Sequence, residues 1–189
     1  MAKLNFDQRA VDEVTVTLDG LGLRRAADEL VVVGGAAMAA FGIKSLGETD
    51  LDIAVTGDLL EHLKHDDRWT DAVDEGKAGP NIKSRQDTAW VVTGDYRGVK
   101  THPGDVSAIR MPLNDGIYSV SSEELIENGV LSLTALAGKG YRFTRPETIL
   151  DWKLALVQSD DQKVDKEKHL SDARLISQRL LFLAFNEQD

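Results

Sequence analysis

Residues 30–55, LVVVGGAAMAAFGIKSLGETDLDIAV, constrain the fold more than any other part of this sequence. They begin with four apolar residues, pass through a Gly-Gly pair into an alanine-rich segment, and end in DLDIAV. The β-branched run predicts a buried strand, and the glycine pair predicts a turn into a short buried helix. If residues 50–55 form a second strand, Asp50 and Asp52 project from the same face, because alternate residues of a strand share a face.

Two carboxylates on one face repel each other, and a divalent cation is a common compensation. Mg²⁺ in particular binds to one or two carboxylates together with phosphate oxygens. Asp50 and Asp52 are therefore predicted metal ligands. Gly34 and Gly35 would place bare backbone N–H groups at the start of a helix, where phosphate binds. The simpler interpretation of this pair is a turn that packs closely against the sheet.

A third carboxylate would complete a site for two Mg²⁺ ions, which clamp the attacking and leaving oxygens of an in-line displacement at phosphorus. Asp105 is the best candidate, because it stands near the start of a strand predicted over residues 104–111. Asp87 and Asp95 compete with it from less strand-like surroundings. An Asp at the start of a strand is also a frequent turn former, so the pattern leaves both interpretations open.

Periodicity and turn residues predict an α/β (α+β) fold, with a mixed β-sheet core flanked by helices and a helical C-terminal part. Helices are predicted over residues 6–21, 36–41, 59–64, 122–128, 144–158 and 165–183. Strands are predicted over residues 30–33, 50–55, 88–93, 104–111 and 141–143, a further strand is predicted to begin at 99, and 66–85 are predicted to form a long loop. We place one boundary near residues 112–121, between a core (1–115) and a mainly helical C-terminal subdomain packed on it (116–189).

The composition narrows the classes of function. The chain has 189 residues, no Cys and a formal net charge of −10. The lack of Cys excludes a disulfide framework, a thiolate zinc site and a cysteine nucleophile. No apolar run approaches the roughly 20 residues that span a bilayer, and the N-terminus lacks a signal-peptide core, so we expect a cytoplasmic protein with no membrane partner. The net negative charge argues against binding to long RNA or DNA. It still allows binding of a nucleotide through a metal ion and backbone amides.

The order of these motifs resembles the nucleotidyltransferase superfamily that includes DNA polymerase β. The matching segments are VGG at residues 33–35, TDLDI at 49–53 and Asp105 in GDVSAI. The resemblance implies a nucleotidyltransferase core and a transferase that moves a nucleoside monophosphate from ATP or another NTP to a hydroxyl acceptor. It also implies that Asp50 and Asp52 bind both Mg²⁺ ions and that Asp105 binds one of them.

The C-terminal helices are similar to those of compact prokaryotic members of this superfamily, including AbiEii-type toxins. PETILDWKL at residues 146–154 looks like one family helix, and KHLSD at 168–172 looks like the other, with His169 in place of the family's first Asp. The resemblance implies that Lys153 contacts the nucleotide phosphates and that Asp172 positions this lysine or the substrate. From the residues alone, Lys153 is a snorkelling helix lysine and Asp172 a solvated helix residue.

One family motif is missing, which bears on the activity. Many relatives carry Arg-x-Thr/Ser just before the acidic pair, where this chain has LGE at residues 46–48. Lys44 could supply the basic phosphate contact, or it could be a solvated loop lysine. The acceptor implied by the resemblance is RNA such as tRNA, a protein or a small molecule, and an antitoxin partner would accompany a toxin. The alternative is a non-catalytic nucleotide- or partner-binding module that retains the fold.

Overall fold

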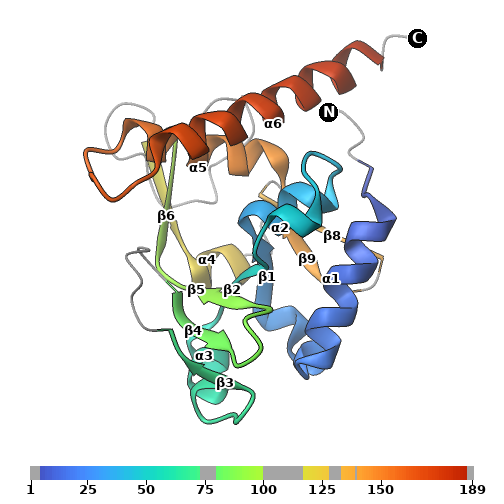
Figure 1. Ribbon diagram of the computed structural model, residues 1–189, viewed down its shortest axis with the longest axis vertical. Helices are drawn as coiled ribbons and strands as arrows, with labels where there is room; N and C mark the ends of the chain where they lie inside the picture. Colours follow the sequence, from blue (N-terminus) through green and yellow to red (C-terminus); the bar gives the residue numbers. More distant parts are fainter. Residues whose placement is uncertain (1–4, 73–79, 100–116, 128–132, 139, 187–189) are drawn as a thin grey trace.

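Seven short strands form the main sheet of the protein (Figure 1). They are β1 (Leu30–Val33), β2 (Asp52–Val55), β3 (Trp69–Asp71), β4 (Pro80–Ser84), β5 (Trp90–Val92), β8 (Thr134–Leu136) and β9 (Arg142–Thr144). Their order is β3-β4-β5-β2-β1-β9-β8, with β1 antiparallel to β2 and parallel to β9, and with β5 parallel to β2. The computed structural model describes residues 5–72, 80–99, 117–127, 133–138 and 140–186. A second sheet pairs β6 (Asp95–Val99) with β7 (Ile117–Ser121).

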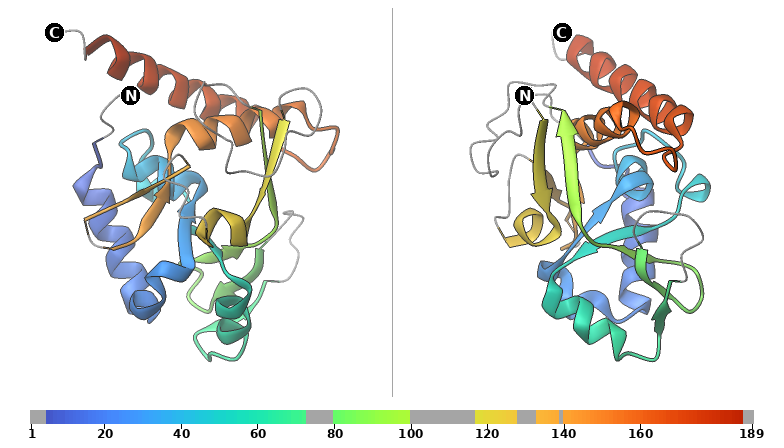
Figure 2. Two further views of the ribbon diagram at one scale, coloured as in Figure 1. Left: turned by 180° about the vertical axis from the view of Figure 1, so that it is seen from behind. Right: turned by 90° about the vertical axis from the view of Figure 1, so that its left-hand side faces the viewer.

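Helices surround the main sheet and cover one end of it. They are α1 (Gln8–Gly20), α2 (Gly34–Ala40), α3 (Gly57–Lys64), α4 (Ser122–Glu127), α5 (Pro146–Gln158) and α6 (Lys166–Asn186), with 3-10 helices η1 (Leu23–Glu29) and η2 (Leu46–Glu48). α5 and α6 pack against each other along one end of the molecule (Figures 1 and 2). α5 also contacts α2 and β6, so it links the C-terminal helices to the sheet.

The sheet buries a different core on each face. Alternate residues of β1 and β2 belong to different clusters, as the two-residue period of a strand requires. One cluster packs against α1, α2 and α5 and includes Leu30, Val32, Ile53, Val55, Met38, Phe41, Phe143 and Ile149. The other packs against the β6–β7 sheet, α4 and α5 and includes Val31, Val33, Ala54, Tyr118, Leu125 and Trp152. Asp52 pairs with Val33 across β1 and β2, so it stands on the face of the second core.

Two helix starts show how local sequence sets the elements. A capping box precedes α4, because Ser121 Oγ accepts the Glu124 N–H at 3.1 Å and Glu124 Oε2 accepts the Ser121 N–H at 3.0 Å. The helix predicted over residues 144–158 begins later, at Pro146. Thr144 belongs to β9, where its hydroxyl donates to the Val32 carbonyl at 3.1 Å, and Arg145 is the N-cap residue.

The predicted fold class is confirmed, since a mixed sheet flanked by helices leads into a helical C-terminal part. Two local predictions are wrong. Residues 66–85 contain β3 and β4 instead of one long loop, and Val99 ends β6 instead of beginning a strand. Both β3 and β4 are short, and among the positions whose burial the structure describes each has one buried apolar residue, Trp69 in β3 and Ile82 in β4. Their sequences therefore show no clear two-residue period.

The C-terminal part contributes strands as well as helices. β9 lies next to β1 and β8 lies beside β9, so residues far along the chain complete the main sheet. The predicted strand over 104–111 lies outside the described residues. The predicted division between 1–115 and 116–189 falls at the edge of the same segment and stays a prediction.

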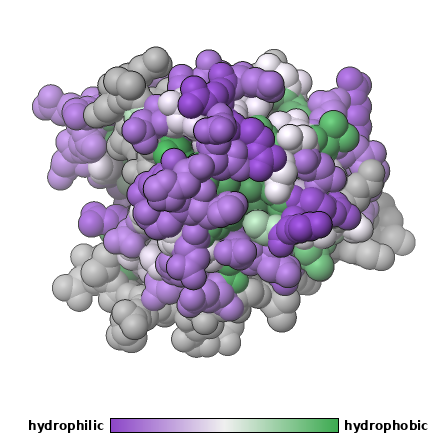
Figure 3. Space-filling view, turned by 90° about the horizontal axis from the view of Figure 1, so that it is seen from below, coloured by the Kyte–Doolittle hydropathy of each residue, from purple (hydrophilic) through white to green (hydrophobic). Residues whose placement is uncertain are grey.

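The surface seen from below is mainly hydrophilic, and its apolar residues form small separate patches (Figure 3). In the part of the chain that the structure describes, no helix is both long enough and apolar enough to cross a membrane.

Candidate active site

The two predicted metal ligands lie at the start of β2. The strand begins at Asp52, so Asp50 stands just outside it instead of within it as predicted. Leu51 and Ile53 are buried, whereas Asp50 is exposed and Asp52 is half-buried. The alternation places the Asp52 side chain on the face opposite to Ile53, and the shared face of Asp50 and Asp52 stays a prediction.

The glycine pair brings the start of α2 close to Asp52. Gly34 has a φ of +62°, which disfavours any residue with a side chain. A Cβ added to Gly34 would lie 3.1 Å from Asp52 Oδ2, and one added to Gly35 would overlap the Thr49 side chain. The close approach of these two side chains therefore accounts for both glycines. The structure therefore agrees with the simpler interpretation of the glycine pair, a closely packed turn. A phosphate contact by the backbone N–H groups of Gly34 and Gly35 stays a prediction.

Three other predicted residues, Lys44, Lys153 and Asp172, meet His169 in one ionic cluster, which we call the lysine cluster. Asp172 Oδ1 lies 3.1 Å from Lys44 Nζ, and Asp172 Oδ2 lies 2.9 Å from Lys153 Nζ. Lys153 Nζ also lies 3.2 Å from His169 Nδ1. The side chains of Lys44, Lys153 and Asp172 are 17%, 12% and 5% exposed. The interpretations of these residues as solvated or snorkelling side chains are therefore wrong.

The lysine cluster carries more positive than negative charge. Burial opposes ionisation of Asp172, but hydrogen bonds and charge interactions with Lys153 and Lys44 hold the pKa of its carboxyl below the usual value. Burial, followed by the positive charge of Lys153, lowers the pKa of His169 to about 4. At neutral pH the cluster therefore has two cations, one anion and an uncharged imidazole. A partly buried site with net positive charge favours binding of an anion.

Packing connects the lysine cluster to the carboxylates. Trp152, which precedes Lys153 on α5, lies in the core beneath the Asp52 face and stacks on Tyr96 with ring centroids 4.5 Å apart. Burial, together with the negative charge of Asp52, raises the pKa of Tyr96. Residues 44–49 follow α2 in the chain and contain η2. They place the Thr49 side chain against Gly35 at the start of α2. The lysine cluster and the acidic pair are thus linked through α2, which contacts both β2 and α5.

The described part of the chain does not show where the third predicted carboxylate lies. Asp105 lies outside them. Asp87 has a φ of +53° in the turn between β4 and β5 and pairs with Lys83 at 2.7 Å. Asp95 is exposed at the first position of β6. Across the described residues, no group of three or more His, Cys, Asp or Glu side chains is arranged to hold a metal ion.

Sequence reasoning missed Trp90 and Tyr96. Trp90 is the partner of Asp52 on the neighbouring parallel strand β5. Tyr96 belongs to β6 and donates its hydroxyl to the Val92 carbonyl at 2.7 Å. Neither residue has a sequence signal, because both acquire their positions through strand pairing.

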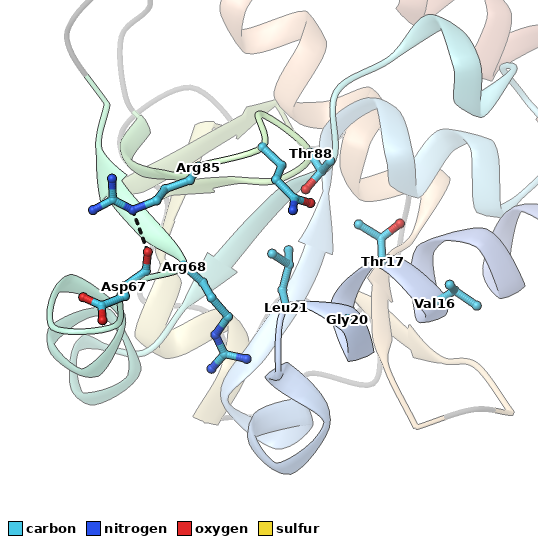
Figure 4. Close-up of a pocket in the computed structure, with 9 residues that line it drawn as sticks. Val16, Thr17, Gly20, Leu21, Asp67, Arg68, Arg85 and Thr88 are labelled. Atoms are coloured by element: carbon cyan, nitrogen blue, oxygen red, sulfur yellow. Dashed lines mark hydrogen bonds between the residues drawn. The ribbon is translucent and has the colours of Figure 1, made fainter.

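A cavity of about 470 Å³ lies elsewhere, between α1 and the β3–β5 region (Figure 4). Its lining contains none of the predicted site residues and consists of Val16, Thr17, Gly20, Leu21, Asp67, Arg68, Arg85, Gln86 and Thr88. Arg85 Nε donates to the Asp67 carbonyl at 2.6 Å, and the Arg68 guanidinium pairs with Asp66 and lies over Gly22. Internal contacts therefore hold both arginines, and the chemistry predicted from the sequence lies away from this cavity.

Comparison with known proteins adds no relative. No protein family, curated protein or solved structure matches this chain. The resemblance to nucleotidyltransferases therefore rests on the sequence motifs alone.

Proposed function

We propose that this protein is a Mg²⁺-dependent nucleotidyltransferase that moves a nucleoside monophosphate from an NTP to a hydroxyl acceptor. One observation carries the proposal. The carboxylate of Asp52 lies against Gly34 at the start of α2, and α2 also contacts α5, which carries Lys153 of the lysine cluster. A metal-bound triphosphate requires both parts, an acidic pair for the metal and a cationic site for the phosphates, on elements that contact each other.

Asp50 and Asp52 are the residues that would hold Mg²⁺. Two carboxylates suit Mg²⁺, because this ion keeps several water ligands and takes its remaining ligands from the phosphates of the substrate. When bound, the ion would neutralise charge that develops on the transferred phosphate.

Lys44 and Lys153 would bind the remaining phosphates and the pyrophosphate product. Asp172 holds both ammonium groups in place, so it acts as a positioning residue. The acceptor oxygen forms a bond to the α-phosphorus, the bond from this phosphorus to pyrophosphate breaks, and the hydroxyl proton leaves to solvent. Most of the rate enhancement then comes from positioning and charge neutralisation.

Label transfer tests the proposal directly. The protein is incubated with Mg²⁺ and each α-³²P-labelled NTP, with total tRNA or cell extract as the source of acceptor. We expect transfer of label that EDTA abolishes and that falls by more than about a hundredfold in Asp52→Ala. Transfer that survives the substitution would contradict the assignment of Asp52. Asp160→Asn, an exposed carboxylate between α5 and α6, is the matched control.

A non-catalytic nucleotide-binding module is the second candidate. Trp90, instead of a carboxylate, pairs with Asp52 on β5, and this observation favours it. Such a module would bind Mg²⁺-NTP in calorimetry but transfer no label to any acceptor. An antitoxin partner and a role as a toxin follow only from the resemblance, and co-purification with a neighbouring gene product would test them.

A further inference from the structure

The register of the main sheet places an aromatic side chain beside the acidic pair. Asp52 pairs with Trp90, and Trp90 pairs with Lys83, so the three residues form one row across β2, β5 and β4. Paired residues of neighbouring strands project from the same face and are about 4.8 Å apart across the sheet. The half-buried indole of Trp90 is therefore the direct neighbour of the Asp52 carboxylate.

The contacts of Lys83 fix one side of this indole. Lys83 Nζ lies 5.0 Å from the centroid of the Trp90 ring, above its face, and 2.7 Å from Asp87 Oδ1. The ammonium group is thus held by a carboxylate on one side and by the ring on the other. β4, which carries Lys83, flanks Trp90 on one side, and β2, which carries Asp52, flanks it on the other.

We propose that Trp90 is the platform on which the base of the nucleotide stacks. The inference rests on the proposed function, because it assumes that the α-phosphate binds to the Mg²⁺ held by Asp50 and Asp52. Only the ribose separates this phosphate from the base, so the base must lie on a close neighbour of the acidic pair. Trp90 offers an aromatic surface there, and its partner Lys83 keeps the ring in place. Stacking on a ring accepts every base, and the larger purines gain more contact than the pyrimidines.

Calorimetry with two ligands separates the base from the phosphates. In the presence of Mg²⁺, we expect the wild-type protein to bind ATP more tightly than inorganic tripolyphosphate by on the order of tenfold. Trp90→Leu should remove this preference and leave the affinity for tripolyphosphate unchanged, whereas Trp90→Phe should keep most of it. The role of Trp90 would be contradicted if Trp90→Leu still bound ATP more tightly than tripolyphosphate. It would also be contradicted if the wild type bound both ligands equally.

Fluorescence gives a second readout that does not depend on the stability of Trp90→Leu. ATP should quench the tryptophan emission of the wild type more than tripolyphosphate does. This difference should disappear in Trp90→Phe and remain in Trp69→Phe, the matched control, because Trp69 is buried on β3. Equal loss of the difference in both variants would contradict the assignment.

Failure of the proposed function has a different signature. If neither ligand binds with Mg²⁺, or if Asp52→Asn leaves both affinities unchanged, the metal and phosphate site itself is wrong. If both ligands bind and depend on Asp52 but Trp90→Leu changes nothing, the site stands and only the platform is wrong.

Discussion

Substitution of Asp172 by Asn tests whether one carboxylate holds the lysine cluster together. Each oxygen of this carboxylate contacts a different ammonium group, at 3.1 Å for Lys44 and 2.9 Å for Lys153. All three side chains are largely buried, so water compensates little for a lost charge. Asn keeps the shape of the side chain and removes the charge, which leaves two ammonium groups near each other without a carboxylate.

The expected cost follows from the repulsion between the lysines. Two ammonium groups that contact one carboxylate lie on the order of 6 Å apart, and with an effective dielectric constant of about 20 they repel by about 3 kcal/mol. Breaking a buried ion pair costs about 3–5 kcal/mol, and the residual exposure of the lysines reduces this value. We expect Asp172→Asn to lower the free energy of unfolding by about 2–3 kcal/mol. Lys44→Met in the same chain should restore about 1–2 kcal/mol, because it removes the repulsion.

Urea unfolding followed by circular dichroism at neutral pH and low salt measures these differences. Asp160→Asn, with an exposed side chain, should change the free energy of unfolding by less than about 0.5 kcal/mol. Sulfate should raise the Tm of Asp172→Asn more than that of Asp160→Asn, because the anion can replace the lost carboxylate. A loss in Asp172→Asn no larger than that of the control would refute the reasoning. So would a double variant in which the two single losses simply add.

Three further predictions follow from single contacts. Gly34→Ala introduces a Cβ at a φ of +62° and 3.1 Å from Asp52 Oδ2, so it should cost about 1–2 kcal/mol and weaken Mg²⁺-ATP binding in calorimetry. His169 has a pKa lowered from 6.5 to about 4 by burial and nearby positive charge, so the unfolded chain binds more protons between these pH values. Stability should therefore fall as the pH drops through that window, by about 1–2 kcal/mol after allowance for partial exposure, in urea unfolding at a series of pH values. Tyr118→Phe removes the hydroxyl that donates to buried Asp151 Oδ2 at 3.0 Å and should cost about 1–3 kcal/mol by the same method.

Each of these predictions has its own control. Gly20→Ala introduces a Cβ with no atom within 4 Å, so it should leave Mg²⁺-ATP binding unchanged, and equal effects of the two glycine substitutions would contradict the role of Gly34. His169→Gln should flatten the pH dependence above about pH 4, since Asp172, whose pKa lies below 3.8, loses its contribution only at lower pH. An unchanged slope would exclude His169 as its source. Tyr96→Phe would show whether loss of any buried hydroxyl costs as much as that of Tyr118.

Several elements were predictable because their signals are local. The apolar run at 30–33 predicted β1, since a strand buried on both faces is apolar at every position. The alternation of aspartates with Leu51 and Ile53 predicted β2, since successive residues of a strand point to opposite faces. The long periodic segments behind α5 and α6 were equally clear. β3 and β4 were missed because single buried residues, Trp69 and Ile82, give no period to recognise.

The sequence by itself determined that an acidic pair follows a Gly-Gly turn, because strand alternation and the freedom of glycine at positive φ are properties of short segments. Only the tertiary structure decided the surroundings of that pair. Lys44 and Asp172 are separated by 128 positions, and the packing of α6 against α5 brings them into contact. Trp90 stands beside Asp52 because β5 pairs with β2, and such pairing depends on the whole sheet. Charge compensation and aromatic contact act through space, and therefore the fold decides them.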